Sequence, residues 1–130
     1  MPTDTKATRG TGPQVGRPVR GSRTGRPIMA ALDLLGRRGA LRILWELRDG
    51  TPRTFRALQA AADANPALLN TRLGELRAAA LVVHEGAGYQ LSSQGVKLLE
   101  ALGPLSAWAA RWGRTQAGAA AAGAEGGGDA

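Results

Sequence analysis

The chain has 130 residues, about the length of one folded domain, and 43% of them are hydrophobic, which is enough for a core. It contains no cysteine and no apolar run of about 18 residues, so we expect no disulfide, thiol switch, cysteine-ligated zinc or membrane helix, and a cytoplasmic location fits. The formal net charge of +7 favours a polyanionic partner, most commonly nucleic acid.

The first 26 residues form a basic segment with hardly any large apolar side chain. Six basic residues stand there with the single acid Asp4, a net charge of +5. Such a segment buries too little surface to offset the entropy of ordering, so we predict a disordered arm over residues 1–26. Gly-Arg-Pro occurs at residues 16–18 and 25–27 and resembles the core of the AT-hook, although neither copy has the preceding Arg of that motif. The alternative is a solvated basic tail that attracts phosphates without sequence preference.

Two helices are expected after the arm. The apolar spacing that follows Pro27 predicts a first helix, which Gly36 ends. A second helix is predicted over residues 40–48. Its apolar stripe, expected to face the core, consists of Leu41, Leu44 and Trp45 and is widened by Ile43 and Leu47.

The next two helices have the spacing of a helix-turn-helix. Thr54 is placed to cap a helix that runs to about residue 62. After a link of two residues, Asn65 is a good N-cap and Pro66 suits the first position of a helix predicted over residues 65–80. So short a link between two capped helices is typical of a helix-turn-helix.

The predicted helix over residues 65–80 has one apolar and one polar face. The apolar stripe consists of Leu69, Leu73, Leu76 and Ala80. The polar face consists of Asn70, Thr71 and Gly74, flanked by Arg72 and Arg77, and its one acid is Glu75. Amide, hydroxyl and guanidinium groups read base edges and phosphates in DNA grooves. An ordinary amphipathic surface helix would show the same spacing.

A β-hairpin is expected directly after this helix. Residues 81–85 have the β-branched character of a strand, residues 86–88 form a three-residue glycine turn, and residues 89–91 form the second strand. A hairpin that follows a helix-turn-helix is a wing. Its tip carries no charge and is preceded by Glu85.

A long helix capped by Ser92 or Ser93 is expected to end the ordered chain. Its apolar residues have nearly the spacing of a heptad seam: Leu98, Leu102, Leu105, Ala109 and Trp112. Pro104 predicts a kink or a division into two shorter helices. Residues 115–130 contain mostly Ala, Gly and acid, and we predict that they are disordered.

This order of elements resembles the HxlR-type transcriptional regulators, relatives of the MarR group. The resemblance covers about residues 27–113 and rests on LLGRRGALRIL (34–44), TFRAL (54–58), LNTRLGEL (69–76), YQLSSQG (89–95) and Trp108. It implies a mainly α winged helix-turn-helix with a small hairpin and a long C-terminal dimerisation helix, here over residues 27–114. It also implies a homodimeric, sequence-specific regulator whose helix 65–80 enters the major groove of double-stranded DNA.

Candidate site residues follow from this resemblance and from the faces of the helices. For DNA, Asn70 and Thr71 are expected on base edges, Arg72 and Arg77 on phosphate or guanine, and Asn65, Arg53 and Arg56 on the backbone. For the dimer interface, the first and last helices offer Ile28, Leu32, Leu105, Trp108 and Trp112.

The sequence departs from the family pattern at three places. Gly39 stands where the family usually has a Trp, and Arg26 stands where many members have a Cys, so no thiol switch is available. Family wings are usually longer and basic, whereas this one is short and neutral. The basic arm is therefore hypothesised to supply minor-groove or flanking phosphate contacts.

Other kinds of function compete with that of a specific regulator. The alternative is an architectural or protein-interaction winged helix without base specificity, favoured by the neutral wing and by the alanines of helix 65–80. No enzyme, cofactor or metal site is expected, because His84 is the one histidine and no ligand cluster, paired catalytic carboxylates or phosphate loop is visible. A small-molecule effector is an open alternative, although the aromatic residues that could line its site are expected to serve packing.

Overall fold

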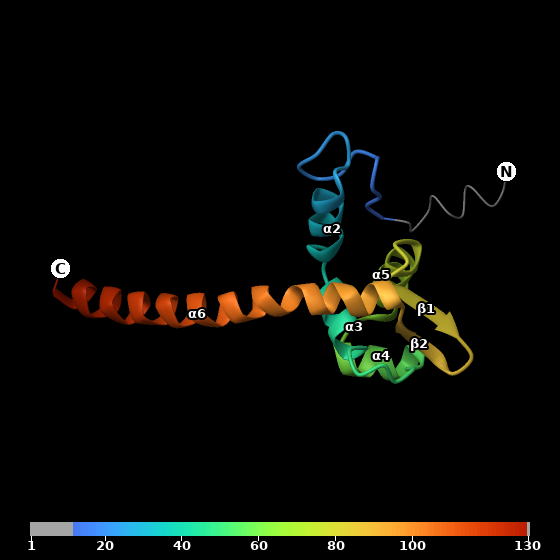
Figure 1. Cartoon of the computed structure of the whole chain (residues 1–130). Coiled ribbons are helices and arrows are strands. Elements are labelled where there is room, and N and C mark those ends of the chain that lie inside the picture. The colour runs from blue at the N-terminus through green and yellow to red at the C-terminus, as the bar shows by residue number, and fades with distance from the viewer. Residues whose placement is uncertain (1–11, 130) are drawn as a thin grey trace. The chain divides into compact units, whose positions relative to one another are not determined.

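The computed structural model describes the backbone of residues 12–129 and the side chains of residues 12–123. Residues 1–11, the first part of the predicted arm, lie outside the described residues. Within residues 12–129 no helix is long and apolar enough to cross a membrane. The elements in chain order are α2 (Pro27–Leu35), α3 (Ala40–Glu46), α4 (Phe55–Ala62), α5 (Pro66–Ala78), β1 (Val82–Glu85), β2 (Gly88–Leu91) and α6 (Ser93–Asp129) (Figure 1).

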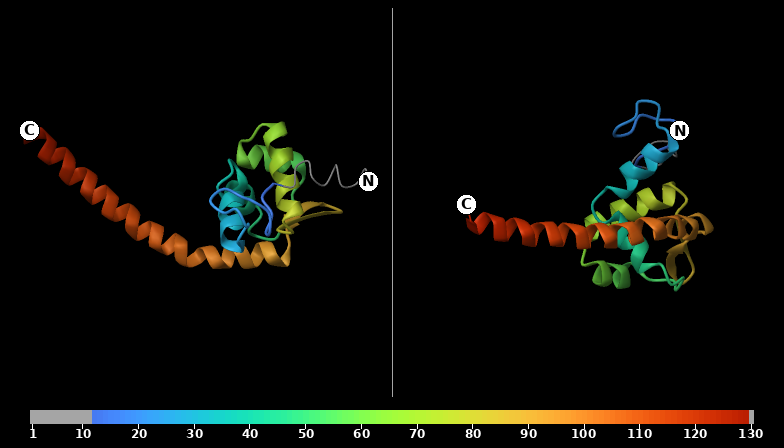
Figure 2. Two further views of the ribbon diagram at one scale, coloured as in Figure 1. Left: turned by 90° about the horizontal axis from the view of Figure 1, so that it is seen from above. Right: turned by 60° about the vertical axis from the view of Figure 1, so that its left-hand side comes forward.

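The chain divides after Leu99 into two compact units. In the described residues, the first unit contains α2, α3, α4, α5, the hairpin and the beginning of α6, and the hairpin extends away from the helices in the left view of Figure 2. The second unit is the remainder of α6. The first unit has the predicted order of a winged helix-turn-helix, with α4 and α5 as the two helices of the motif and the hairpin as the wing.

Three of the helices have a side-chain N-cap at the predicted residue. Thr54 Oγ1 accepts a hydrogen bond from the Ala57 N–H at 3.1 Å and so begins α4. At α5, Asn65 Oδ1 accepts from the Leu68 N–H at 2.7 Å. Ser92 Oγ accepts from the Gly95 N–H at 3.0 Å at the beginning of α6. Each bond satisfies a first-turn donor that has no partner within its helix.

The end of α5 differs from the sequence prediction. Ala80, expected on the buried stripe, is exposed and lies beyond the helix with a left-handed φ of 62°. Its N–H donates to the Arg77 carbonyl, and the Leu81 N–H donates to the Leu76 carbonyl at 2.9 Å. These two bonds form a Schellman motif, which reverses the chain and brings β1 directly after α5.

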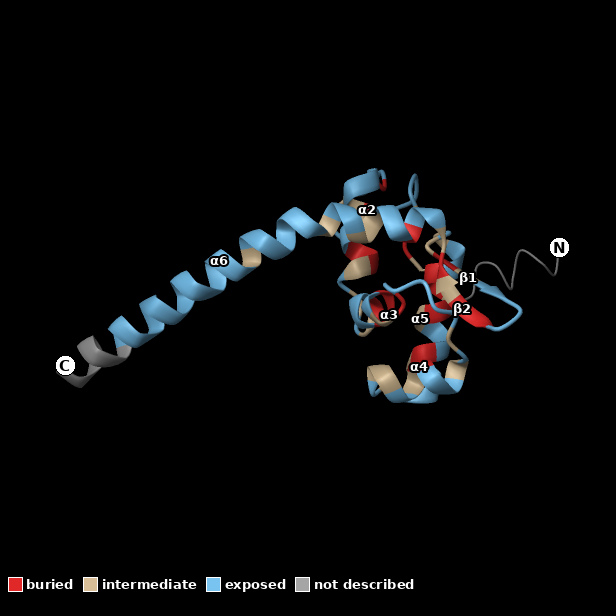
Figure 3. Ribbon diagram, turned by 60° about the horizontal axis from the view of Figure 1, so that its bottom comes forward, coloured by how far each residue is buried: buried red, intermediate tan, exposed pale blue. Residues whose placement is uncertain are grey.

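The hydrophobic core joins α2, α3, α4, α5 and the hairpin, as the buried residues in Figure 3 show. Its members are Leu34, Ile43, Leu44, Leu47, Leu58, Leu69, Leu73, Leu76, Val82, Tyr89 and Leu91. The prediction that Leu41 and Trp45 face this core is wrong, because they are 46% and 54% exposed. The segment that contains α3 is apolar on two sides, and the side with Ile43 and Leu47 packs against the core.

The hairpin pairs Val82 with Leu91 and Glu85 with Gly88, so its tip has two residues rather than the predicted three. Gly88 belongs to β2 because the chain before α4 lies against it. The Arg53 N–H donates to the Tyr89 carbonyl at 2.9 Å, and the Tyr89 N–H donates back at 2.7 Å. A Cβ on Gly88 would clash with the Arg53 carbonyl, and its φ of 145° also requires glycine.

Two segments predicted to be disordered have described structure. Residues 12–26 form a loop closed by a hydrogen bond from the Gly16 N–H to the Gly25 carbonyl at 2.9 Å. The last helix is undivided, with Pro104 inside it, and it continues through the tail to Asp129. The alanines of the tail favour a helix, since Ala has the highest helix propensity. The domain limits of 27 and 114 stay a prediction.

Candidate nucleic-acid interface

The exposed face of α5 presents polar groups and no carboxylate. Asn70, Thr71 and Arg77 are exposed, as predicted for the polar face. Glu75, the one acid of this helix, is only 4% exposed and turns away from that surface. The exposed side of α5 therefore offers an amide, a hydroxyl and a guanidinium to an anionic partner without a competing negative charge.

Arg72, expected on the flank of this face, is bound to the protein itself. Its side chain is only 15% exposed. The Nε group donates to the Arg38 carbonyl at 2.7 Å, and Nη1 donates to Glu75 Oε1 at 3.0 Å. Two of its donor groups are thus already used in holding α5 against the segment that precedes α3.

Two buried carboxylates share the guanidinium of Arg37. Its Nη1 lies 3.2 Å from Glu75 Oε2, and its Nε lies 3.6 Å from Asp33 Oδ1. Asp33 and Glu75 are 7% and 4% exposed, so both charges need these partners. The ion pairs connect α2 with α5 and include Arg72 through Glu75.

Arg53 also has partners within the protein. Its Nε donates to the Glu46 carbonyl at 2.9 Å, and its Nη2 lies 3.2 Å from Asp49 Oδ2. The Thr51 N–H donates to Asp49 as well, and this bond together with the charge of Arg53 lowers the pKa of the Asp49 carboxyl. Arg53 is therefore held beside the turn before α4.

The beginning of α5 borders a cleft of about 240 Å³ that contains two basic residues not predicted for DNA. Arg38 and Arg42 line it together with Asn65, whose side-chain oxygen caps α5. Gly39 lies in the same lining and has a φ of 87°. Arg38 precedes α3 and Arg42 lies in it, so only the folded chain brings them to Asn65. Outside this cleft, Arg56 of α4, which is also predicted to contact DNA, is exposed.

His84 is a side chain of the wing, as predicted. His84 lies on β1 with its ring stacked on Tyr89, 4.0 Å between centroids.

In α6, the Trp108 and Trp112 rings stack at 5.5 Å and are 49% and 51% exposed. The other residues expected at a dimer interface are also exposed: Ile28 63%, Leu32 54% and Leu105 54%. Among the residues that the structure describes, no group of acids and histidine could hold a metal ion.

Comparisons with known proteins agree with this architecture. The uncharacterized HTH-type transcriptional regulator MJ0925 of Methanocaldococcus jannaschii is 28% identical over 89 residues, which cover 65% of this chain and 83% of that protein. The crystal structure of the quinone-bound YodB from B. subtilis matches with a TM-score of 0.62 and 27% identity, over 65% of this chain and 97% of that one. The profile of the HxlR-like helix-turn-helix family matches residues 34–117, and the chain therefore belongs to this family of transcriptional regulators.

Proposed function

We propose that this chain is a homodimeric, cytoplasmic regulator that places α5 in the major groove of double-stranded DNA and reads its sequence. The observation that carries the proposal is the exposed face of α5, where Asn70 and Thr71 lie on a helix whose one acid, Glu75, is buried. An Asn amide can form two hydrogen bonds with an adenine edge, and a Thr can bond to any base or contact a thymine methyl.

The basic residues around α5 are assigned to the DNA backbone. Arg77 and Arg56 are exposed and free to reach phosphates or, for Arg77, a guanine. Arg53 and Arg72 have only those donors that their contacts with Asp49, Glu75 and backbone carbonyls leave available. Their main contribution is to hold α4 and α5 in position, and Asn65 directs the N-terminus of α5 toward a phosphate.

A second candidate, an architectural DNA binder without base specificity, is favoured by the neutral wing tip. Gly86 and Ala87 offer no side-chain donor, and α5 also exposes the small residues Ala67 and Ala78. Such a protein would bind through phosphates and DNA shape alone. The two candidates differ in how single substitutions affect cognate and random DNA.

Replacing Asn70 with alanine is expected to weaken binding to the cognate site by about 1–3 kcal/mol and to leave binding to random DNA unchanged. The replaced amide reads a base edge, so one position of the site becomes relaxed. Arg56→Ala is the matched comparison, because it removes a phosphate contact and should weaken both DNAs alike. Titration of labelled duplexes at one salt concentration measures both effects. Equal losses on the two DNAs for Asn70→Ala would remove it from the reading face.

A further inference from the structure

Residues 16–26 form a closed basic loop in which the two Gly-Arg-Pro copies lie side by side. Besides the bond between Gly16 and Gly25, Val19 and Ser22 exchange backbone hydrogen bonds of 2.9 and 3.0 Å. Gly25 is buried, and a Cβ there would clash with the backbone of Arg17. The copies thus pack against each other instead of forming the extended strand that an AT-hook requires.

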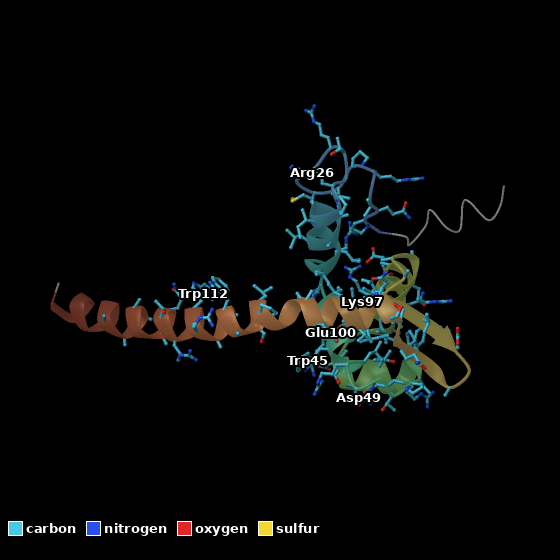
Figure 4. All side chains as sticks on the ribbon, in the orientation of Figure 1. Arg26, Trp45, Asp49, Lys97, Glu100 and Trp112 are labelled. Carbon is cyan, nitrogen blue, oxygen red and sulfur yellow. The ribbon has the colours of Figure 1, made fainter. Side chains whose placement is uncertain are left out.

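The basic loop is attached to α2, and the chain just before the loop lies against α5. Ser22 Oγ accepts hydrogen bonds from the N–H groups of Gly25 and Arg26 at 3.1 and 3.2 Å, where the loop meets α2 (Figure 4). The Arg20 N–H donates to Asp33 Oδ2 on α2 at 3.1 Å. Before the loop, Gly12 packs against the Glu75 side chain of α5. The loop is therefore anchored to α2, and Gly12 places the preceding chain beside α5.

The charge of the basic loop is entirely positive. Four arginines, all exposed, lie within its eleven residues: Arg17, Arg20, Arg23 and Arg26. No acid occurs between Gly12 and Leu32, and the nearest one along the chain, Asp33, is buried and shared by Arg37 and Arg20, whose Nε atoms both lie 3.6 Å from its Oδ1. Arg20 is thus partly compensated although its side chain stays 75% exposed, whereas Arg17, Arg23 and Arg26 form no ion pair among the described residues.

We propose that the basic loop is a second DNA-binding site, which binds backbone phosphates beside the segment that α5 reads. This proposal rests on the proposed function. Arginine forks suit phosphate oxygens, and a loop already closed by hydrogen bonds loses less conformational freedom on binding than a disordered arm does. The loop supplies the positive charge that the wing tip, Gly86 and Ala87, does not have.

The charge of the loop is tested with Arg17→Ala and Arg23→Ala combined in the full chain. The control combines Lys97→Ala and Arg114→Ala, which remove the same charge from exposed positions of α6. Affinity for the cognate duplex is measured against salt. The slope of log affinity against log salt should become shallower by about 0.9 for each phosphate that the variant no longer binds, relative to the control. If the variant loses two such phosphate contacts, the factor by which its affinity falls between about 50 and 200 mM salt is about twelvefold smaller than for the control. A slope equal to that of the control would overturn the proposal.

The closed shape of the loop is tested without a change of charge. Gly25→Ala places a Cβ against the Arg17 backbone, whereas Gly16→Ala places one in open space. Both glycines have positive φ, 68° and 83°, so the two variants share the cost of backbone strain. Gly25→Ala should weaken cognate binding roughly two- to tenfold more than Gly16→Ala does, with the same melting temperature of the core. Equal affinities would show that the arginines act as a flexible arm and would contradict the closed loop as the binding element.

Failure of this proposal is distinguishable from failure of the proposed function. If the natural protein binds the cognate duplex in preference to random DNA but both loop variants match their controls, only the loop proposal is wrong. If the natural protein binds no duplex, the proposed function fails and the loop proposal fails with it.

Discussion

Replacing Glu75 with glutamine is expected to lower the free energy of unfolding by about 2–3 kcal/mol. Its buried carboxylate holds two guanidinium groups, those of Arg37 at 3.2 Å and Arg72 at 3.0 Å. Removal of one partner from a fully buried ion pair costs about 3–5 kcal/mol. The expected value is lower because these arginine side chains keep 26% and 15% exposure and can be partly hydrated.

The measurement is urea unfolding followed by circular dichroism. Glu85→Gln is the matched control, because Glu85 is an exposed acid at the end of β1. The control should change the stability by less than about 0.5 kcal/mol. If Glu75→Gln is as mild as Glu85→Gln, the ion pairs of Arg37 and Arg72 do not stabilise the position of α5.

Replacing Trp108 and Trp112 together with alanine is expected to convert a dimer into a monomer. The two stacked rings are half exposed, and burial of such a pair against a second copy would remove a large apolar area from water. Interface tryptophans commonly cost about 2 kcal/mol or more each when truncated. The two in one protomer alone correspond to roughly a thousandfold in the dissociation constant of the dimer, and the variant lacks the pair in both protomers.

Light scattering of the natural protein and of the variants measures the assembly. The control is Leu41→Ala with Trp45→Ala, which removes a similar exposed apolar pair from α3 (Figure 4). This pair is not among the residues expected at the interface, so its variant should stay dimeric. A variant without Trp108 and Trp112 that keeps the mass of a dimer would contradict the interface assignment.

Local signals in the sequence were sufficient to place most helices and the hairpin. Thr54 and Asn65 cap the helices at the predicted residues because capping depends on a side chain and an N–H only three residues apart. The hairpin follows from β-branched residues next to a glycine turn. The turn length was predicted incorrectly because the position of Gly88 depends on Arg53, a neighbour distant in the sequence.

The partners of charged side chains could not be predicted from spacing. The expectation that Arg72 contacts DNA stays a prediction, but its bonds to Glu75, one turn away, and to the Arg38 carbonyl, which the fold brings to it, do not follow from spacing. Trp45 was expected in the core because α3 is apolar on two sides, and only the packing of the other helices selects one side. Burial and long-range pairing are properties of the whole chain rather than of one segment.

The composition of residues 12–26 also conceals their contacts. Few large apolar residues and many arginines predict disorder, because no core can form from them. The closed loop instead depends on glycine backbones packed together and on a buried carboxylate, Asp33, outside the segment. The Gly-Arg-Pro copies begin nine residues apart, at Gly16 and Gly25, and the backbone hydrogen bond between these two glycines closes the loop. The sequence alone does not reveal this bond.

The central claim is that α5 reads a DNA sequence, and selection from a random duplex pool tests it most directly. The natural protein should enrich one motif, arranged as an inverted repeat with half-sites about 10 base pairs apart, since a symmetric dimer presents two copies of α5. Asn70→Ala should enrich the same motif with one position relaxed in each half-site. Enrichment of only A·T-rich sequences without a motif, by both proteins, would contradict sequence reading by α5.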